Sequence, residues 1–244
     1  MKVQINCTAN LGDFLNAMPV LSGMSKQENE KIHLIIRKEM RKFNGIKEFL
    51  MLQDIFEDVS FDDEIFMYQM NPINLSSWSR YDRNDPNRPI ETCRYENWLK
   101  DNYAYDVNTD DNFHLVIPKL DIDYHEDMIV IGDRWSSKED PSIDTRRKTY
   151  VIKDSGKFNN LSVHYLDYSR PLLENAAIIH YNTNKFFTTF TGIGILADLM
   201  HKPMTVLWDD DMRDWDGHPV AYDFERHYYK DRSATLEYIG DFTL

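Results

Sequence analysis

The feature that most constrains the fold is a unit found near both ends of the chain: a short apolar strand pattern, a glycine-containing turn and an apolar helical pattern. Near the N-terminus, residues 3–7 form the strand pattern and residues 8–13 the turn. In the second half, residues 185–189 precede a turn at residues 191–194, and a short apolar helix follows. This order predicts parallel sheets covered by helices.

Between these two units, strand and helix patterns continue to alternate, so the whole chain is predicted to be α/β. Residues 71–111 mix prolines and aromatic residues with polar ones and are predicted to be mostly loop. The tail after residue 209 shows no regular pattern. The further elements predicted are strands at residues 31–37, 64–68, 127–132, 161–166 and 204–208, and helices at residues 45–52, 91–103 and from Pro171 onward.

Composition excludes several classes of protein. The 244 residues are 42% hydrophobic, which is enough to bury a core, so a disordered chain is excluded. A net charge of −13 argues against coating nucleic acid by bulk charge. Cys7 and Cys93 are the only cysteines, which excludes a disulfide framework and a four-thiolate zinc site. No apolar run is long enough to span a membrane and no signal peptide is visible, so a cytoplasmic location is expected.

Gly12 and Asp13 stand at the end of the first predicted strand. Ligands of open α/β sheets bind beyond the carboxyl ends of the strands, and a glycine there lets the backbone approach a ligand closely. Asp13 is therefore a candidate general base that would accept a proton from an incoming hydroxyl. The alternative is that Asp13 only caps the following helix.

The second candidate motif is the turn Thr191, Gly192, Ile193 and Gly194. A strand end followed by small residues and a helix N-terminus offers backbone N–H groups and a partial positive charge to a phosphate. Thr191 could add a hydroxyl. The turn is not a P-loop, because no Gly-Lys-Ser/Thr follows, and the same residues would also suit an ordinary tight turn.

Taken together, the two motifs resemble the heptosyltransferase-type glycosyltransferases, family 9. The opening segment LGDFLNAMPVL has that family's Gly-Asp, a spacer, and then Pro and an apolar residue. The segment ENAAIIHYNTNKFFTTFTGIGILADLMHKPMTVLW resembles the same family's donor-binding region. The matching positions are Gly12, Asp13, Pro19 and Val20 in the first segment, and Thr191, Gly192, Ala197, Lys202 and Pro203 in the second.

The resemblance implies a GT-B-like architecture, with two small Rossmann-type domains facing a cleft. We expect an N-terminal acceptor domain at residues 1–122 and a C-terminal donor domain at residues 123–244. The resemblance implies that a nucleotide-sugar donor, for example a UDP-sugar, binds in this cleft. No separate cofactor and no metal are expected.

The resemblance also assigns roles to residues. It implies that Asp13 is the catalytic base. It implies that Gly12 and the turn Thr191, Gly192, Ile193 and Gly194 hold the donor, with Arg134 or Lys138 supplying a positive charge to the phosphates. Two positions depart from the family pattern: Phe190 replaces an aspartate and Ile195 replaces a histidine.

Several alternatives stay open. The acceptor is either a glycan or a hydroxymethylated base in phage DNA, in which case the compartment would be the host cytoplasm. A basic cluster in the N-terminal half could receive an anionic acceptor such as DNA, or could be a solvated surface. An acidic run at residues 209–211 could bind a metal or be a solvated loop. The rival function is a non-catalytic, nucleotide-binding Rossmann-type protein. The basic cluster comprises Lys31, Arg37, Lys38, Arg41, Lys42 and Lys47.

Overall fold

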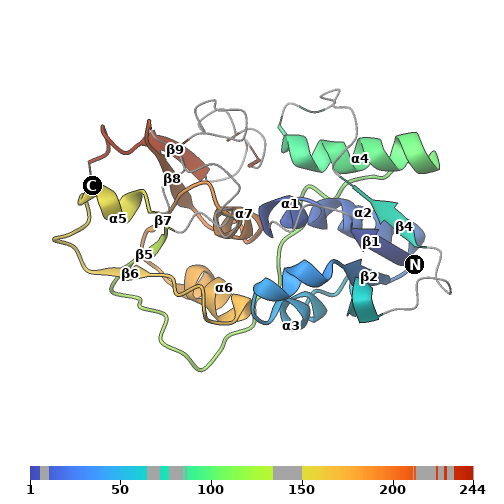
Figure 1. Cartoon of the computed structure of the whole chain (residues 1–244), viewed down its shortest axis with the longest axis horizontal. Coiled ribbons are helices and arrows are strands. Elements are labelled where there is room, and N and C mark those ends of the chain that lie inside the picture. The colour runs from blue at the N-terminus through green and yellow to red at the C-terminus, as the bar shows by residue number, and fades with distance from the viewer. Residues whose placement is uncertain are drawn as a thin grey trace.

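The structure is a computed structural model and consists of two lobes, each built on one parallel sheet, arranged along the long axis (Figure 1). Every strand pair in the described part of the chain is parallel. The described residues are 1–5, 11–64, 72–76, 85, 87–133, 150–210, 212, 224, 228–229 and 234–243.

The N-terminal lobe has four strands in the spatial order β3-β2-β1-β4. The order reverses between β1 and β4, which defines the switch point of this sheet. The strands are β1 (Lys2–Ile5), β2 (Ile32–Ile36), β3 (Phe56–Phe61) and β4 (Ile73–Leu75). The helices of this lobe are α1 (Leu11–Leu15), α2 (Met18–Glu28), α3 (Ile46–Met51) and α4 (Ile90–Tyr103), with two 3-10 helices, η1 (Lys38–Lys42) and η2 (Asp62–Glu64).

The C-terminal lobe has five strands in the order β6-β5-β7-β8-β9, with its switch point between β5 and β7. The strands are β5 (Ile129–Gly132), β6 (Val163–Tyr165), β7 (Phe186–Thr188), β8 (Met204–Trp208) and β9 (Ala234–Tyr238). The helices are α5 (Ile152–Ser155), α6 (Leu172–Tyr181) and α7 (Gly192–Leu199).

Three strands differ from the sequence-based expectation. A strand was expected at residues 64–68, but β3 lies at Phe56–Phe61; residue 64 belongs to η2 and residues 65–68 lie outside the described part. The register between β2 and β3 shifts at Ile32 and His33, which places an extra residue in β3 and breaks the alternation of apolar and polar residues. Strands β4 and β9 were expected to be irregular; they are short and lie at sheet edges, where polar residues are tolerated.

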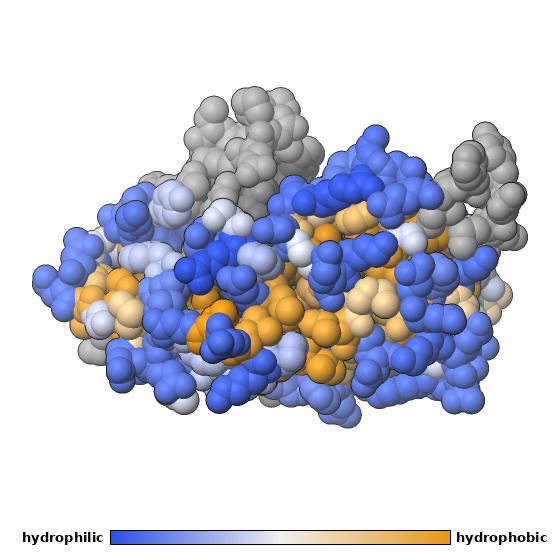
Figure 2. All heavy atoms as spheres, turned by 90° about the horizontal axis from the view of Figure 1, so that it is seen from below, coloured by the Kyte–Doolittle hydropathy of each residue, from blue (hydrophilic) through white to orange (hydrophobic). Residues whose placement is uncertain are grey.

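The two lobes share one apolar core. A single cluster of buried side chains extends from β1 and β2 through α1 and α7 to β7 and β8. Helix α1 packs against α7, and α3 packs against α6. Seen from below, hydrophobic residues also gather near the middle of the long axis (Figure 2). A continuous apolar interface of this kind fixes the relative position of the lobes.

The segment between α4 and β5 is pinned to both lobes. The backbone N–H of Val116 donates to the side-chain oxygen of Gln53 in the N-terminal lobe, 2.8 Å. The N–H of Leu115 donates to the carbonyl of Leu199 on α7, 3.0 Å. The hydroxyl of Tyr181 on α6 donates to the carbonyl of Ile117, 2.8 Å. This segment therefore reinforces the contact between the lobes.

Candidate active site at the lobe interface

The switch points of the two sheets face each other across the interface. Helix α1 follows β1, one of the two strands at the N-terminal switch point, and α7 follows β7 at the C-terminal one. Because α1 packs against α7, the carboxyl ends of β1 and β7 meet at one place. The general rule for open α/β sheets predicts ligand binding there. The two sequence motifs, separated by almost the whole chain, are thus brought together.

The contact between α1 and α7 depends on two glycines. A Cβ atom on Gly192 would lie 2.7 Å from the Cβ of Leu11 and 2.9 Å from the backbone nitrogen of Gly12. A Cβ atom on Gly12 would lie 2.6 Å from the Cδ1 of Ile195. Real Cβ atoms do not approach backbone this closely, so Gly192 is required by the close approach of the two helices.

Thr191 caps the N-terminus of α7. Its backbone is extended, with φ −135° and ψ 160°, and its hydroxyl accepts a hydrogen bond from the N–H of Gly194, 3.3 Å. The hydroxyl also lies 3.3 Å from that of Thr188 at the end of β7. The turn predicted from the sequence is therefore a capped helix N-terminus, with Gly192, Ile193 and Gly194 in its first turn.

Gly194 is also enclosed by an aromatic side chain. A Cβ on Gly194 would lie 2.3 Å from the hydroxyl of Tyr228, which is buried. Burial raises the pKa of Tyr228 well above its ordinary value. The first turn of α7 is thus closed by Tyr228 on one side and by α1 on the other.

Asp13 lies in the first turn of α1 and its side chain is half-buried. Its backbone carbonyl accepts a hydrogen bond from the hydroxyl of Tyr95 on α4, 2.9 Å. The hydroxyl of Thr92 on α4 donates to the carbonyl of Asn16, 3.0 Å. Helix α4 therefore holds α1 in place and fixes the position of Asp13 beside α7.

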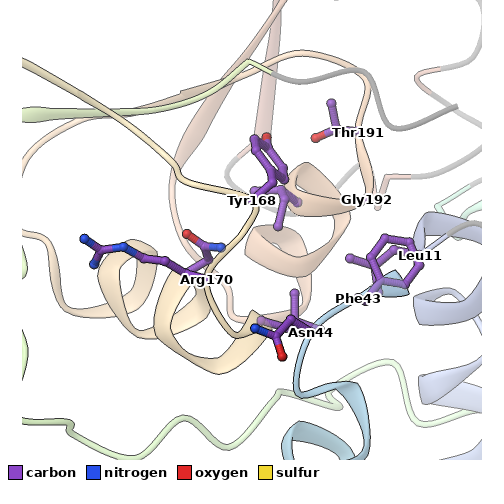
Figure 3. A pocket seen from close by; sticks show the side chains of 10 residues that line it. Leu11, Phe43, Asn44, Tyr168, Arg170, Thr191 and Gly192 are labelled. Carbon is purple, nitrogen blue, oxygen red and sulfur yellow. The ribbon is translucent and has the colours of Figure 1, made fainter. Parts of the chain in front are cut away.

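A pocket opens between the lobes next to this contact (Figure 3). We call it the interdomain pocket; it encloses about 410 Å³ of empty space, part of which is open to solvent. Leu11 and Phe43 reach it from the N-terminal lobe, and Tyr168 and Arg170 from the loop after β6. Asp13 follows Leu11 on the same helix, after Gly12, but does not line the pocket. The complete lining is Leu11, Phe43, Asn44, Tyr168, Arg170, Leu172, Asn175, Thr191, Gly192 and Ile193.

A second pocket, which we call the strand-end pocket, lies at the carboxyl ends of β5 and β6. It has about 650 Å³ of empty space and shares Tyr168 with the interdomain pocket. The ammonium of Lys153 lies 5.7 Å from the ring centre of Tyr150 and 5.8 Å from that of Tyr165. Aromatic ring faces suit stacking on a planar ring, and a lysine ammonium suits an anionic group attached to that ring.

Asp133 forms a wall of the strand-end pocket, but its carboxylate is already bonded to backbone N–H groups of the protein. Its carboxylate accepts hydrogen bonds from the backbone N–H groups of Val151, Ile152 and Lys153, at 2.9, 2.9 and 2.7 Å. Burial raises the pKa of Asp133, and these three bonds oppose that shift. Asp133 therefore caps the N-terminus of α5 and is not free to bind a ligand.

Two predicted phosphate ligands, Arg134 and Lys138, lie outside the described residues. The structure places two other basic residues at the pockets: Lys153 at the strand-end pocket and Arg170 at the interdomain pocket. Sequence reasoning missed both. Neither Lys153 nor Arg170 belongs to a motif in the sequence, and only the folded chain brings them to the pockets.

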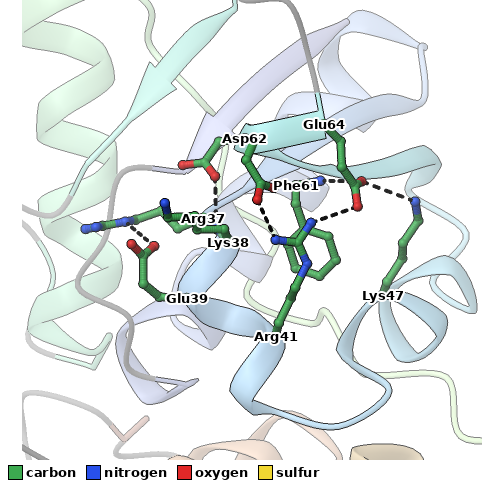
Figure 4. A network of polar contacts seen from close by, with 9 residues as sticks. Arg37, Lys38, Glu39, Arg41, Lys47, Phe61, Asp62 and Glu64 are labelled. Carbon is green, nitrogen blue, oxygen red and sulfur yellow. Dashed lines mark hydrogen bonds and ion pairs between the residues drawn. The ribbon is translucent and has the colours of Figure 1, made fainter.

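Arg37, Arg41 and Lys47 of the predicted basic cluster are paired with neighbouring carboxylates (Figure 4). The guanidinium of Arg41 donates to Asp63 at 2.7 Å and to Glu64 at 2.8 Å, and it lies over the ring of Phe61. Lys47 lies 3.9 Å from Glu64. Paired charges of this kind attract phosphates weakly, so the pattern favours a structural surface over a face for DNA.

The acidic run after β8 is used within the protein where the structure describes it. Asp209 accepts a hydrogen bond from the N–H of Met212, 3.1 Å, and Asp210 accepts one from the hydroxyl of Tyr238, 2.7 Å. Within the described residues, no group of three or more histidine, cysteine or carboxylate side chains could hold a metal ion.

The two departures from the family pattern are both packed into apolar surroundings. Ile195 is buried against Gly12, and Phe190 makes edge contacts with the rings of Phe224 and Tyr228. Neither position offers a polar group to a ligand. None of the helices in the described part combines the length and the apolarity needed to cross a membrane.

No protein-family model matches the sequence, and no curated protein matches it significantly. Solved structures do match. A family 9 glycosyl transferase from Veillonella parvula DSM 2008 has a TM-score of 0.59 at 11% identity, over 97% of this chain and 85% of the other. The E. coli heptosyltransferase WaaC with ADP has a TM-score of 0.54 at 9% identity, over 98% of this chain and 93% of the other.

E. coli ADP-heptose LPS heptosyltransferase II has a TM-score of 0.54 at 10% identity, over 100% of this chain and 95% of the other. At such low identity these likenesses concern the fold alone. The chain has the GT-B-like fold of family 9 glycosyltransferases, and the predicted fold class is confirmed.

Proposed function

We propose that this chain is a glycosyltransferase that moves a sugar from a nucleotide-sugar donor to an acceptor hydroxyl. The observation that carries the proposal is the meeting of the two switch points, which puts α1 with Asp13 against the capped N-terminus of α7. Sugar transfer needs a base and a site for the leaving phosphates close together, each held by a rigid element. The acceptor would bind at residues 1–122 and the donor mainly at residues 123–244.

In the proposed reaction, Asp13 accepts the proton of the acceptor hydroxyl while its oxygen attacks the anomeric carbon. The bond from that carbon to the phosphate oxygen breaks, and the nucleoside diphosphate leaves. The N-terminus of α7 would stabilise the developing negative charge through Gly192 and Ile193, which line the interdomain pocket, whereas the N–H of Gly194 is already bonded to Thr191. Lys153 or Arg170 join Arg134 or Lys138 as cationic candidates. We propose that this step needs no metal.

The nucleoside would occupy the strand-end pocket, since Tyr150, Tyr165 and Tyr168 offer ring faces and Lys153 a positive charge. WaaC, a structural neighbour, is described with ADP, and another is named for ADP-heptose. ADP-sugars therefore join UDP-sugars as donors to test. The pairing of Arg41 and Lys47 with carboxylates favours a glycan as acceptor over a hydroxymethylated DNA base.

A second candidate function is nucleotide binding without catalysis. Ile195 and Phe190 favour it, because both fill space with apolar groups where the resembling family has polar ones. Under this alternative Asp13 would have no chemical role.

The deciding experiment combines binding with turnover. Thermal unfolding with ADP, UDP, GDP and their sugar conjugates should show a rise in Tm for at least one nucleotide, because ligands that bind only the folded state stabilise it. Asp13→Asn should keep that rise and slow release of nucleoside diphosphate by about 100-fold or more. Asp101→Asn, an exposed change on α4, is the matched control. Unchanged turnover in Asp13→Asn would refute the assigned base, and no rise in Tm with any nucleotide would refute the donor site.

A further inference from the structure

The side chain of Asn175 is a buried amide in the wall of the interdomain pocket. It lies on α6 and is 2% exposed. Its Nδ2 donates to the backbone carbonyl of Asp167, 2.9 Å, which fixes the orientation of the amide. Its Oδ1 is buried and has no hydrogen-bond partner. A buried carbonyl oxygen without a donor is costly and rare, so the unpaired Oδ1 calls for an explanation.

The surroundings of Asn175 indicate what kind of ligand would supply the missing donor. Phe43 and Tyr168 give the pocket aromatic walls, while Leu11 and Ile193 give it aliphatic ones. None of the described residues that line it carries a carboxylate. A ring with apolar faces and hydroxyl groups at its edge fits these walls, because the faces cover the apolar side chains and one hydroxyl can donate to Oδ1.

The position of the pocket relative to α7 identifies which ring this would be. Thr191, Gly192 and Ile193, at the N-terminus of α7, form part of the same wall. This is the turn proposed above to hold the donor diphosphate. The strand-end pocket, proposed for the nucleoside, lies on the other side of Tyr168. A donor that extends from one pocket past Tyr168 to the turn would place its sugar in the interdomain pocket.

We propose that Asn175 determines donor-sugar specificity by accepting, through Oδ1, a hydrogen bond from one ring hydroxyl of the sugar. This inference rests on the proposed function, because it requires a nucleotide-sugar donor. It goes beyond it by assigning the sugar to the interdomain pocket and its selection to one side chain on α6. The backbone carbonyl of Asp167 holds the amide in place before the ligand binds, so binding loses little side-chain entropy at Asn175.

The test measures binding by calorimetry for matched pairs: UDP with UDP-glucose, ADP with ADP-glucose, and GDP with GDP-mannose. Wild type should bind the sugar conjugate of its preferred nucleotide about tenfold more tightly than the bare diphosphate, because the hydroxyl pairs a buried acceptor. Asn175→Ala should bind the bare diphosphate as wild type does and lose most of that tenfold gain. Alanine opens space in the pocket, so the loss cannot arise from a steric block.

A second measurement begins with the wild-type protein and identifies the hydroxyl that Asn175 binds. Conjugates that lack one ring hydroxyl at a time are compared on wild type, and removal of one particular hydroxyl should weaken binding by about tenfold. The same removal should have no further effect on Asn175→Ala. Asn102→Ala serves as the matched control, because Asn102 is an exposed asparagine on α4.

The possible failures are distinguishable. If no nucleotide and no conjugate binds wild type, the proposed function is refuted, and this inference with it. If a diphosphate binds but its sugar conjugate gains nothing, or if Asn175→Ala keeps the full gain, the role of Asn175 is refuted while the donor site stands. If Asn175→Ala fails to fold, a flat response of wild type to all hydroxyl removals still overturns the proposal.

Discussion

Two helix N-termini lie at the switch point of the C-terminal sheet, and the protein treats them differently. Helix α5, which follows β5, has its first N–H groups bound by the carboxylate of Asp133. Helix α7, which follows β7, is capped by the neutral hydroxyl of Thr191, which accepts a hydrogen bond from the N–H of Gly194. Helix N-termini favour negative charge, so α5 carries its own anion and α7 does not.

The difference suggests that the helix N-termini after β5 and β7 have different roles. An internal carboxylate at α5 stabilises the fold and excludes an external anion. At α7, the close packing of α1 and the open interdomain pocket leave the first turn beside a space that a ligand can fill. Of the two helix N-termini, only that of α7 lies beside a pocket with no carboxylate of the described residues as its cap, which agrees with the donor site proposed there.

The largest effect on stability and binding is expected when a side chain is added at Gly192, between α1 and α7. In Gly192→Ala the new Cβ would clash with Leu11 and with the backbone of Gly12. We expect the free energy of unfolding to fall by about 3 kcal/mol, because backbone cannot yield without separating the helices, and nucleotide binding to be lost. Urea unfolding and calorimetry measure both. Gly132→Ala, whose Cβ would meet Ile193 at 3.2 Å, should cost clearly less; equal costs would contradict the importance of the α1–α7 contact.

The next largest effect is expected when the carboxylate that caps α5 is removed. Asp133→Ala would leave three buried or partly buried N–H groups without their acceptor, so we expect a loss of about 2 kcal/mol in the free energy of unfolding. Asp133→Asn keeps one acceptor oxygen and should lose less. Urea unfolding at neutral pH measures both variants. Wild-type stability in Asp133→Ala would show that α5 does not need this carboxylate.

A smaller effect is expected at the cap of α7. Thr191→Val removes the hydroxyl that accepts from Gly194 and keeps the shape, and it should cost about 1 kcal/mol of stability. If backbone N–H groups hold the diphosphate, affinity should fall by only a few-fold, since the hydroxyl already serves as the cap. Thr191→Ser should restore stability. A complete loss of nucleotide binding in the valine variant would instead make the hydroxyl a direct ligand.

The smallest expected effect is a dependence of stability on pH that arises from His164 on β6. His164 on β6 stacks on His125, and burial, followed by the charges of His125 and Arg170, lowers the pKa of His164. The unfolded chain therefore takes up a proton near the ordinary histidine pKa while the folded protein resists it, so stability should fall as pH drops below about 6.5. Thermal unfolding from pH 7.5 to 5 tests this. His164→Gln should flatten the curve, and an unchanged curve would exclude His164 as the cause.

The sequence predicted those parts of the site that depend on local patterns. Gly12 and the Thr191–Gly192 turn follow strand patterns, and the resemblance to the glycosyltransferases implied that both face one cleft. The interdomain pocket was not predictable, because Phe43 and Asn175 carry no local signal and become neighbours only when the lobes pack. Asp133 follows the strand predicted at residues 127–132; that its carboxylate accepts from the N–H of Val151, 18 positions later, depends on tertiary structure.

The fold shows the same limit. Buried central strands such as β2, β7 and β8 are runs of apolar residues and were predicted close to their observed positions. Strands β3 and β9 were not, although β9 alternates apolar and polar residues, because edge strands bury one face only and resemble exposed loops. The edge strand β6 is an exception, since it was predicted at residues 161–166 and lies at Val163–Tyr165.

The apolar cluster that runs through both sheets has a consequence for cooperativity, although a second cluster, which includes Ile131 and Phe187, packs within the C-terminal lobe alone. Because the first cluster includes Leu34 of β2 and Val206 of β8, loss of packing in one sheet removes support from the other. Amide hydrogen exchange should therefore find one protected unit spanning both sheets, with a shared opening free energy. A nucleotide bound to the C-terminal lobe would slow exchange in β1 and β2 as well. A ligand bound to one lobe would thus reduce local opening in the other lobe, without any hinge motion.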